Sequence, residues 1–264
     1  MPEIPLFQVD AFATQLFGGN PAAVCPLEKW LDDNVLLAIA AENNLSETAF
    51  ILRRQDGDYD LRWFTPTIEV NLCGHATLAA AHVVFHHLDV DATRVVFHSQ
   101  SGPLIVQRDG DRATMDFPAT PPHYDRPADD LVAELDAVPE ATYRIREVHR
   151  RPYVLAVFAD QATVAGLAPR IGEMRANVIC TAPGDGVDFV SRFFAPLSGV
   201  DEDPVTGSAH CALAPYWAKR LGKTGLLARQ ISQRGGEVGC RVQGDRVLLT
   251  GKTVHYLKGV ITLP

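Results

Sequence analysis

The chain has 264 residues, of which 47% are hydrophobic and 21% charged, proportions typical of a soluble globular protein. Its formal net charge is −8, with no cluster of Lys and Arg. This excludes a typical nucleic-acid binder, which needs a basic face to neutralise phosphates. No apolar run approaches the roughly 20 residues that span a bilayer, and no signal sequence begins the chain, so we expect a cytoplasmic protein without a membrane partner. The five scattered cysteines lack a Cys-x-x-Cys pair, which predicts reduced thiols rather than disulfides or a zinc site.

Strand signals dominate the first half of the chain. Strands are predicted over residues 4–12, 48–52, 59–64, 94–99 and 104–107, with a further strand ending at Phe117. Residues 18–21, Gly-Gly-Asn-Pro, predict a tight loop, and Asp32 is expected to cap a helix over residues 34–42. Residues 74–88 are nearly all Ala, Leu, Val, Phe and His, which predicts a helix buried on most sides.

A proline-rich stretch separates the two halves. Residues 118–127 hold four prolines, so we expect a linker that cannot continue a sheet ladder. After it we predict a helix over residues 128–135, strands over 154–158 and 189–194, and a second central helix from about Thr206 to Leu221. Pro215 would kink this second helix unless the helix starts late. The expected class is α+β, with an N-terminal lobe over residues 1–118 and a C-terminal lobe over 119–252.

One segment recurs half a chain later. Residues 62–66, Arg-Trp-Phe-Thr-Pro, with Val70 after them, match residues 192–196, Arg-Phe-Phe-Ala-Pro, with Val200 after them, at a constant offset of 130. A second match is found later in each half. Residues 99–102, Ser-Gln-x-Gly, and 110–112, Gly-Asp-Arg, recur as residues 232–235 and 244–246. Chance matching of short words is the alternative. Two blocks that agree in order and spacing favour a tandem pair of related lobes.

Each copy of the repeated segment leads into a small-residue helix, beginning near Gly74 and Gly207. A helix N-terminus carries unpaired N–H groups and a partial positive charge, so two of them facing one cleft would hold a carboxylate without a cofactor. Cys73 and Asp203 precede the two helices at positions that the repeat matches, where a thiol or a carboxylate can act as acid or base. The alternatives are that both glycines only pack helix against strand, that Cys73 is a small core residue, and that Asp203 is an ordinary helix cap.

A further carboxylate stands at a loop-to-strand junction. Glu47 follows Ser46 in residues 44–50, just ahead of an apolar strand. If that junction lines the cleft, burial would make Glu47 a stronger base and suit it to move a proton; otherwise it is a solvated edge charge. His75 and Ser208 would orient substrate or cap their own helices. His82, His86 and His87 are expected to be packing or surface residues rather than ligands.

Five motifs occur in one order along the chain. They are residues 7–12, Phe-Gln-Val-Asp-Ala-Phe; 18–24, Gly-Gly-Asn-Pro-Ala-Ala-Val; 44–50, Asn-Leu-Ser-Glu-Thr-Ala-Phe; 73–77, Cys-Gly-His-Ala-Thr; and 202–209, Glu-Asp-Pro-Val-Thr-Gly-Ser-Ala. Together they resemble the PhzF family of phenazine-biosynthesis-like isomerases over essentially the whole chain. The resemblance implies a diaminopimelate epimerase-like fold: two pseudo-symmetric lobes, each a strand-rich barrel around a central helix, with the active site between them. It also implies that a C-terminal strand, residues 253–264, returns to the first lobe.

The resemblance also assigns site residues. It implies catalytic roles for Glu47, His75, Asp203 and Ser208, no metal, no cofactor and, by analogy with the family, a homodimer. Contacts to the substrate, a small carboxylate-bearing metabolite, are expected from the following residues: Asn20, Ser46, Cys73, Gly74, Thr206 and Gly207. Related epimerases use two cysteines at the helix starts, whereas this chain keeps only Cys73, so a two-thiol racemase is disfavoured.

Three functions remain open on the sequence. The leading hypothesis is a cofactor-independent isomerase in which Glu47 moves a proton on a carboxylate-bearing substrate. The nearest alternative is an amino-acid epimerase or racemase that uses Cys73 with Asp203 as an unequal acid/base pair. The third is a non-catalytic protein of the same fold that binds a small molecule or another protein.

Overall fold

The computed structural model describes residues 3–125, 129–148 and 151–263, and the chain divides into two compact units. The first unit comprises Met1–Asp116 with Thr250–Pro264, and the second comprises Phe117–Leu249. Each unit has its own strands and a central helix. No helix within the described ranges is long and apolar enough to cross a membrane.

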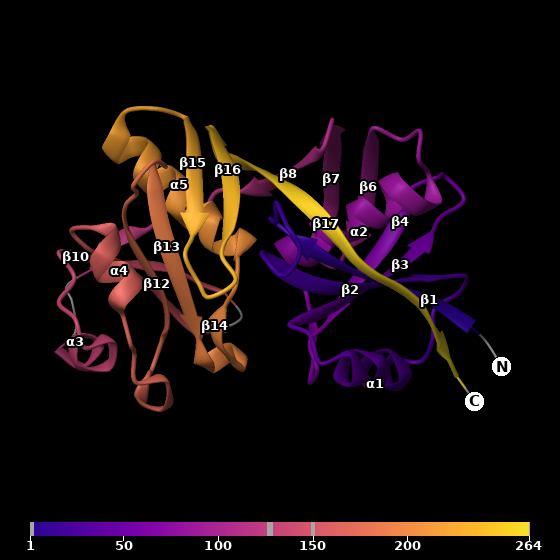
Figure 1. The fold of residues 1–264 in the computed structure, drawn as a ribbon, viewed down its shortest axis with the longest axis horizontal. Coiled ribbons are helices and arrows are strands. Elements are labelled where there is room, and N and C mark those ends of the chain that lie inside the picture. The colour runs from indigo at the N-terminus through magenta and orange to yellow at the C-terminus, as the bar shows by residue number, and fades with distance from the viewer. Residues whose placement is uncertain (1–2, 126–128, 149–150, 264) are drawn as a thin grey trace. The chain divides into compact units, whose positions relative to one another are not determined.

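The first unit is a closed ring of strands around helix α2 (Figure 1). Its elements are β1 (Glu3–Ala11), β2 (Asn20–Leu27), α1 (Asp33–Asn43), β3 (Glu47–Arg53), β4 (Tyr59–Phe64), β5 (Glu69–Val70), α2 (Gly74–Val83), η1 (Val84–Leu88), β6 (Arg94–Ser99), β7 (Gly102–Asp109), β8 (Arg112–Pro118) and the returning part of β17 (Arg246–Thr262). Around the ring the order is β17, β1, β2, β3, β4, β6, β7 and β8, and β8 pairs with β17 to close it. The β2–β3 and β4–β6 pairs are parallel. The chain crosses from β2 to β3 through α1 and from β4 to β6 through α2.

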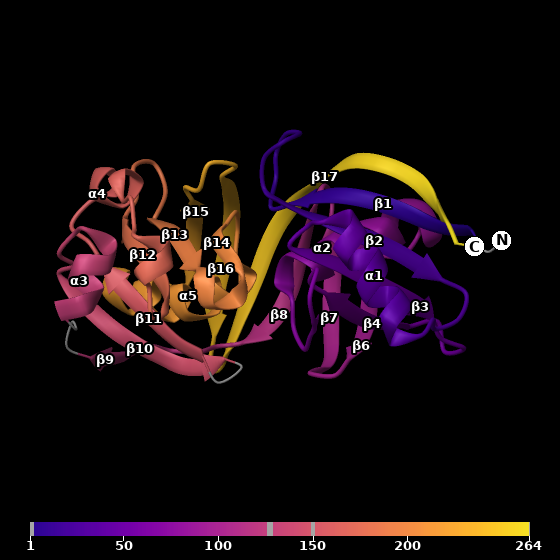
Figure 2. The same ribbon diagram turned by 90° about the horizontal axis from the view of Figure 1, so that it is seen from below.

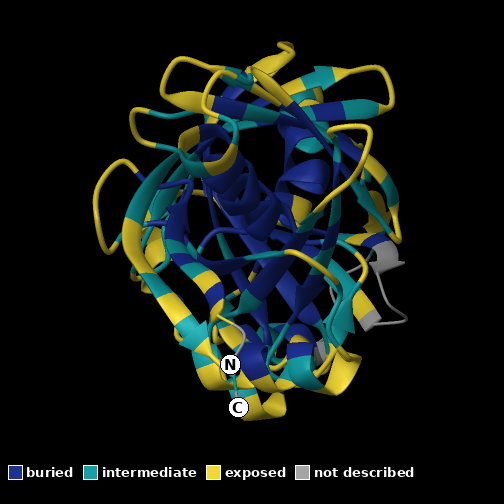
Figure 3. Ribbon diagram, turned by 90° about the vertical axis from the view of Figure 1, so that its right-hand side faces the viewer, coloured by how far each residue is buried: buried dark blue, intermediate teal, exposed yellow. Residues whose placement is uncertain are grey.

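Helix α2 fills the interior of this ring. Every residue from Gly74 to Val83 is buried, while exposed residues gather in the connecting loops (Figure 3). The small side chains of the helix allow strands to approach closely on several sides. The sequence predicts one helix over residues 74–88, whereas the structure changes to a π-helical turn, η1, at Val84. This turn closes with a hydrogen bond from the Asp89 N–H to the Val84 carbonyl (2.8 Å).

The C-terminal strand belongs to the first unit. β17 runs antiparallel to β1, from Glu3 opposite Thr262 to Ala11 opposite Thr253, with a bulge between Gln8 and Val9 (Figure 2). One neighbour of β1 is thus the distant strand β17, and the other is β2, the next strand along the chain.

The second unit repeats this order of elements from β10 onward, after an additional strand and helix, β9 and α3, and it includes the start of β17 up to Leu249. It contains β9 (His123–Asp125), α3 (Asp129–Leu135), β10 (Ala141–Val148), β11 (Arg151–Val157), α4 (Gln161–Gly166), η2 (Ile171–Glu173), β12 (Asn177–Pro183), β13 (Phe189–Ala195), η3 (Pro196–Ser198), β14 (Val200–Asp203), α5 (Gly207–Leu221), β15 (Gly225–Gln230) and β16 (Gly236–Gln243). The pairs β11–β12 and β13–β15 are parallel, with α4 and α5 in the crossovers, as α1 and α2 are in the first unit. The predicted α+β class with two pseudo-symmetric lobes is confirmed.

Helix α5 is anchored by an aromatic pair. Trp217 is fully buried, stacks on Phe189 with ring centroids 5.6 Å apart, and donates its Nε1–H to the Thr181 hydroxyl (3.0 Å). Pro215 lies inside α5, which nevertheless starts at Gly207 and continues to Leu221, so the helix does not start late.

Other expectations are corrected by the structure. The proline-rich segment does contribute to a sheet: β9 pairs with β10, because His123, Tyr124 and Asp125 lie between the prolines and keep their N–H groups. The tight loop predicted at residues 18–21 ends at Gly19, and Asn20 already begins β2. Asp32 occupies the N-cap position of α1, but its side chain makes no capping hydrogen bond. Residue 128, the expected start of α3, lies outside the described residues.

Candidate active site

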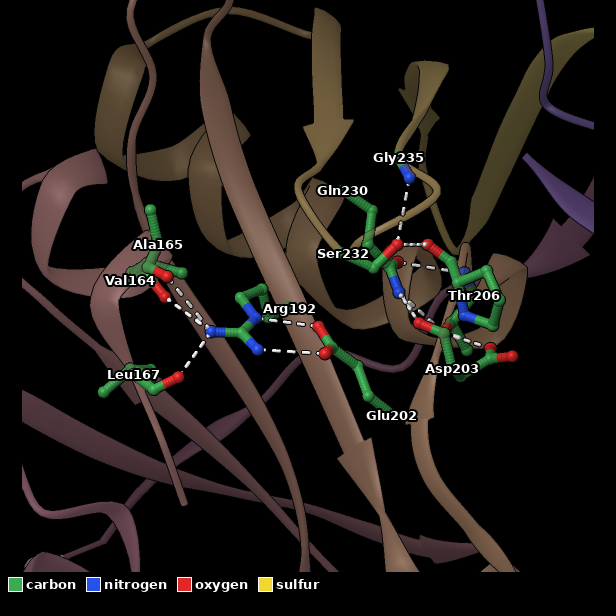
Figure 4. Close-up of polar contacts among 11 residues, drawn as sticks. Val164, Ala165, Leu167, Arg192, Glu202, Asp203, Thr206, Gln230, Ser232 and Gly235 are labelled. Atoms are coloured by element: carbon green, nitrogen blue, oxygen red, sulfur yellow. Dashed lines mark hydrogen bonds and ion pairs between the residues drawn. The ribbon is translucent and has the colours of Figure 1, made fainter. Parts of the chain in front are cut away.

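The approaches to the two central helices contain matching ion pairs. In the first unit Arg62 on β4 makes two hydrogen bonds to Glu69. Its Nε–H donates to Oε1 (2.7 Å) and its Nη2–H donates to Oε2 (2.7 Å). In the second unit Arg192 on β13 makes the same two-pronged bond to Glu202 (2.7 and 2.9 Å) (Figure 4). Arg192 also donates to the Leu167 carbonyl just after α4 (2.7 Å). The repeated arginines therefore tie each strand to the segment that leads into its helix.

Strand register fixes which residues correspond between the units. Val70 pairs with Trp63 on β4, and Asp203 pairs with Phe193 on β13, so Asp203 is the counterpart of Val70. The sequence expectations that Asp203 matches Cys73 and that Val200 matches Val70 are therefore wrong. The cause is three additional residues before β14, in the region of the turn η3, which the constant offset of 130 cannot show.

The residues directly before the helices are Cys73 and Thr206. Cys73 is the N-cap of α2 and Thr206 is the N-cap of α5. In each case the N-cap carbonyl accepts a hydrogen bond from the side chain four residues later. Thr77 Oγ1 donates to the Cys73 carbonyl (2.5 Å), and His210 Nδ1 donates to the Thr206 carbonyl (2.7 Å). Thr206 is the residue of the second unit that stands where Cys73 stands in the first.

Three candidate residues of the first unit surround the imidazole of a fourth, His75. His75 Nε2 lies 3.2 Å from Glu47 Oε2, and His75 Nδ1 lies 3.2 Å from Asn20 Nδ2 and 3.5 Å from Cys73 Sγ. The side chains of His75 and Glu47 are 5% and 19% exposed, so both are largely removed from water. The cluster forms because β2 and β3 are parallel, which places their first residues, Asn20 and Glu47, at the same end of the ring as the start of α2.

Burial keeps the imidazole neutral. Loss of hydration lowers the pKa of His75 to about 3, so its contact with Glu47 is not an ion pair at neutral pH. The Asn20 amide nitrogen can only donate, which makes Nδ1 an acceptor and places the proton on Nε2, facing Glu47. The Glu47 and His75 atoms are close enough for a hydrogen bond but are not aligned for one.

The candidate residues of the second unit form another polar group (Figure 4). The Thr206 hydroxyl donates to Asp203 Oδ2. Gln230, which is fully buried, accepts from the Thr206 N–H (2.9 Å) and donates to the Asp203 carbonyl (2.7 Å). Ser232 Oγ donates to the Pro204 carbonyl (2.7 Å). The segment from Asp203 to Thr206 is thus held on both sides, and the Asp203 carboxylate is oriented by the N-cap hydroxyl.

Gln230 was not predicted from the sequence as a residue of this site. This residue positions the start of α5, but no pattern in the sequence separates it from other polar residues of β15. Ser232, its neighbour in the network, belongs to the second repeated block. Ser208 is exposed in the first turn of α5, and Gly207 is the first residue of that helix. Ser46 is partly buried directly before β3.

Comparison with known proteins agrees with this fold. The profile of the phenazine biosynthesis-like protein family, PhzC-PhzF, matches residues 9–259, and the chain belongs to this family. An uncharacterized isomerase from Pseudomonas aeruginosa is 53% identical over 99% of this chain and 100% of its own length. The crystal structure of a PhzF family phenazine biosynthesis protein from Enterococcus faecalis is 44% identical, with a TM-score of 0.93 over 99% of this chain and 100% of that one. A hydroxyproline epimerase from Agrobacterium vitis, 11% identical, has the same fold over 98% of this chain and 92% of its own, with a TM-score of 0.64.

Proposed function

We propose that this protein is a cofactor-independent isomerase that moves a proton on a small carboxylate-bearing substrate, with Glu47 as the general acid/base. The observation that carries the proposal is the placement of Glu47 Oε2 3.2 Å from the Nε2 of a buried imidazole, His75, near the start of α2. A carboxylate held beside a buried imidazole N–H, with little exposure to water, is a suitable proton carrier. Isomerase names among close relatives support the same class of reaction.

In the proposed reaction Glu47 takes a proton from one carbon of the substrate and returns it to another. The electron pair of the broken C–H bond passes into the conjugated system of the substrate, and the composition of the substrate is unchanged. The neutral His75 presents its Nε2–H to Glu47, and in the proposed reaction this N–H would hydrogen-bond to the carboxylate and hold it in place. The first N–H groups of α2, from Gly74 onward, are unpaired within the helix and can bind the substrate anion.

The proposal extends to the second unit by analogy with the family. Asp203 and Ser208 would hold polar groups of the same substrate, assisted by Thr206 and Gly207. In support, Asp203 is held by two neighbours, through the Thr206 hydroxyl and through Gln230. We also propose that the protein is a cytoplasmic homodimer; sedimentation velocity would report a monomeric mass if the dimer is wrong.

Hydrogen exchange with solvent tests the chemistry. Incubation of the protein in heavy water with a panel of small unsaturated carboxylates and amino acids, followed by NMR, should reveal a compound that gains deuterium at one carbon. Glu47→Gln should lower that rate by about 10² to 10⁴, the usual contribution of a general acid/base. Cys73→Ala should change the rate only mildly. Normal turnover in Glu47→Gln together with loss of turnover in Cys73→Ala would contradict the assignment.

A second candidate function rests on Cys73. Its sulfur lies 3.5 Å from His75 Nδ1, and a thiol beside an imidazole can be an acid or base in an epimerase. In that case Cys73→Ala would abolish exchange at the α-carbon of an amino acid. A non-catalytic binding protein would bind a carboxylate and exchange no hydrogen in any variant.

A further inference from the structure

Three histidines meet at the other end of the central helix of the first unit. They are His82 from α2, His87 from η1 and His255 from β17, and one ring nitrogen from each lies within 4.8 Å of the others. His82 is seven residues beyond His75, which corresponds to about 10 Å along a helix axis. The cluster is therefore separate from the imidazole that contacts Glu47.

The π-helical turn allows this meeting. In an α-helix, residues five apart point about 140° away from each other, so His82 and His87 would lie on different faces. The wider turn of η1 brings them back toward one side, with ring centroids 6.2 Å apart. The His87 ring then lies 4.9 Å from that of His255. Such π-helical turns often occur at functional sites.

In two of these rings one nitrogen is already held by an oxygen atom. His255 Nε2 lies 3.0 Å from the Leu257 carbonyl, which can only accept, so Nε2 carries the proton and Nδ1 keeps a lone pair. His82 Nδ1 lies 2.7 Å from the Thr253 hydroxyl, which can accept in the same way and leave the Nε2 lone pair available. Histidines that bind metals nearly always have their second nitrogen bonded to an oxygen in this manner.

Two cations lie near the cluster and are engaged elsewhere. Lys258 packs over the Phe7 ring at 5.6 Å, and Arg108 Nη1 donates to the Phe85 carbonyl (3.2 Å).

Contrary to the expectation from the sequence that His82 and His87 are packing or surface residues, we propose that His82, His87 and His255 form a binding site for a divalent transition-metal ion, with Zn²⁺ as the representative ion. Three neutral imidazoles and one water complete a tetrahedral set, in which nitrogens at 2.0–2.1 Å from zinc lie about 3.4 Å apart. The present separations of up to 4.8 Å are larger, and the partly exposed His87 and His255 close on the ion by side-chain rotation. The bound ion joins β17 to the central helix and stabilises the first unit.

Two other clusters in the described part of the chain could hold a cation. One is Glu47, Cys73 and His75, and the other is Asp56, Asp58 and His98. In the latter, Asp56 is paired with Arg54 and His98 Nε2 with Asp58 at 2.8 Å, so its arrangement is explained without an ion. The experiment must therefore separate all three clusters.

Zinc binding by the full chain, produced without a polyhistidine tag and treated with a chelator, tests the proposal. We expect one high-affinity equivalent of Zn²⁺ by titration and a rise of Tm on loading, because the ion binds the folded state. The double variant His87→Gln/His255→Gln should lose both effects. His123→Gln is the control, since His123 is an exposed histidine on β9 of the second unit and has no part in the cluster, and Cys73→Ser and His98→Gln should also retain binding.

Each other outcome overturns the site. Wild-type protein that binds no Zn²⁺, a double variant that binds it as the wild type does, or loss of binding in Cys73→Ser or His98→Gln would each contradict the proposal. A circular dichroism spectrum of the double variant that matches the wild type ensures that loss of the ion is not loss of the fold.

Discussion

Asn20 decides which nitrogen of His75 carries the proton. Its amide lies 3.2 Å from Nδ1, and because an amide nitrogen only donates, the Nε2–H is left to face Glu47. The carboxylate is thereby placed beside a donor rather than beside a lone pair. Asn20 is fully buried, so water does not compete for this bond. In the proposed mechanism Asn20 is a positioning residue that acts through His75.

Replacing Asn20 with Asp should reverse this arrangement. A carboxylate only accepts, so His75 Nδ1 must carry a proton in Asn20→Asp, and ¹⁵N NMR of the ring should show protonated Nδ1 where the wild type shows Nε2–H. Turnover should fall as well. Asn43→Asp is a suitable control, because Asn43 donates to Thr48 and does not contact the ring. Unchanged ring shifts in Asn20→Asp would show that the tautomer is assigned wrongly.

Buried neutral histidines make the stability depend on pH. Burial lowers the pKa of His210 to about 4, against 6.5 in the unfolded chain, although the bond to the Thr206 carbonyl acts in the opposite direction. Between these values the unfolded state binds a proton that the folded state does not. The free energy of unfolding is therefore not reduced by His210 above pH 6.5. As the pH falls from 6.5 toward 4, it decreases by up to about 1.4 kcal/mol per pH unit because of this histidine.

His210→Asn should flatten this dependence. The Asn amide can replace the Nδ1–H donor to the Thr206 carbonyl but does not titrate. Denaturant unfolding at a series of pH values from 7 to 4 gives the free energy of unfolding as a function of pH. Its slope should be shallower in His210→Asn than in the wild type, by up to about 1.4 kcal/mol per pH unit, which corresponds to one proton. Buried His75 and His82 keep the remaining slope, and the exposed His123→Asn is the control. Equal slopes for His210→Asn and the wild type would contradict a neutral buried imidazole.

At the scale of elements, a glycine controls how closely β17 approaches α2. A Cβ built on Gly251 would lie 2.4 Å from the Phe12 ring and 3.1 Å from Leu78. Gly259, in the same strand, has only an ordinary contact, with Leu257 at 3.7 Å. The two positions therefore differ in packing but share one strand and one unit.

Alanine at these glycines should have opposite consequences. Gly251→Ala must displace a buried ring, and we expect a loss of about 1 to 3 kcal/mol in the free energy of unfolding, as for other overpacked cores. Gly259→Ala should be neutral or slightly stabilising, because it only reduces the freedom of the unfolded chain. Urea titrations of both variants measure the difference. Equal stability of the two would mean that β17 does not approach α2 as closely as described.

Elements with a local signal were predictable from sequence, and elements that depend on distant partners were not. The apolar run of α2 and the alternation in β4 are visible in the chain, and the five motifs led to the correct family. The strand β9 was missed because its pairing with β10 is tertiary, and η1 was missed because its residues continue the helical pattern. The match of Asp203 to Cys73 failed because an insertion within the repeat has no marker in the sequence.

At the scale of the whole molecule, the candidate residues are shared between two units. Asn20, Glu47, Cys73, Gly74 and His75 belong to the first unit. Asp203, Thr206, Gly207 and Ser208 belong to the second. The repeated architecture gives each unit a central helix with a polar cluster at its start. The cluster of the first unit contains an imidazole beside a carboxylate, and that of the second contains a carboxylate that accepts from a threonine hydroxyl. The proposed function makes turnover depend on residues of both clusters.

A double-mutant cycle tests this dependence. Residues that act as a unit on one transition state are strongly non-additive, so Glu47→Gln/Asp203→Asn should lose little more turnover than the more impaired single variant. Solvent-deuterium incorporation into the substrate found in the heavy-water screen measures all three variants. Asp201→Asn removes an exposed carboxylate two residues from Asp203 and should retain wild-type turnover. Losses that multiply would mean that the two groups act independently, and wild-type turnover in Asp203→Asn would remove the second unit from the reaction.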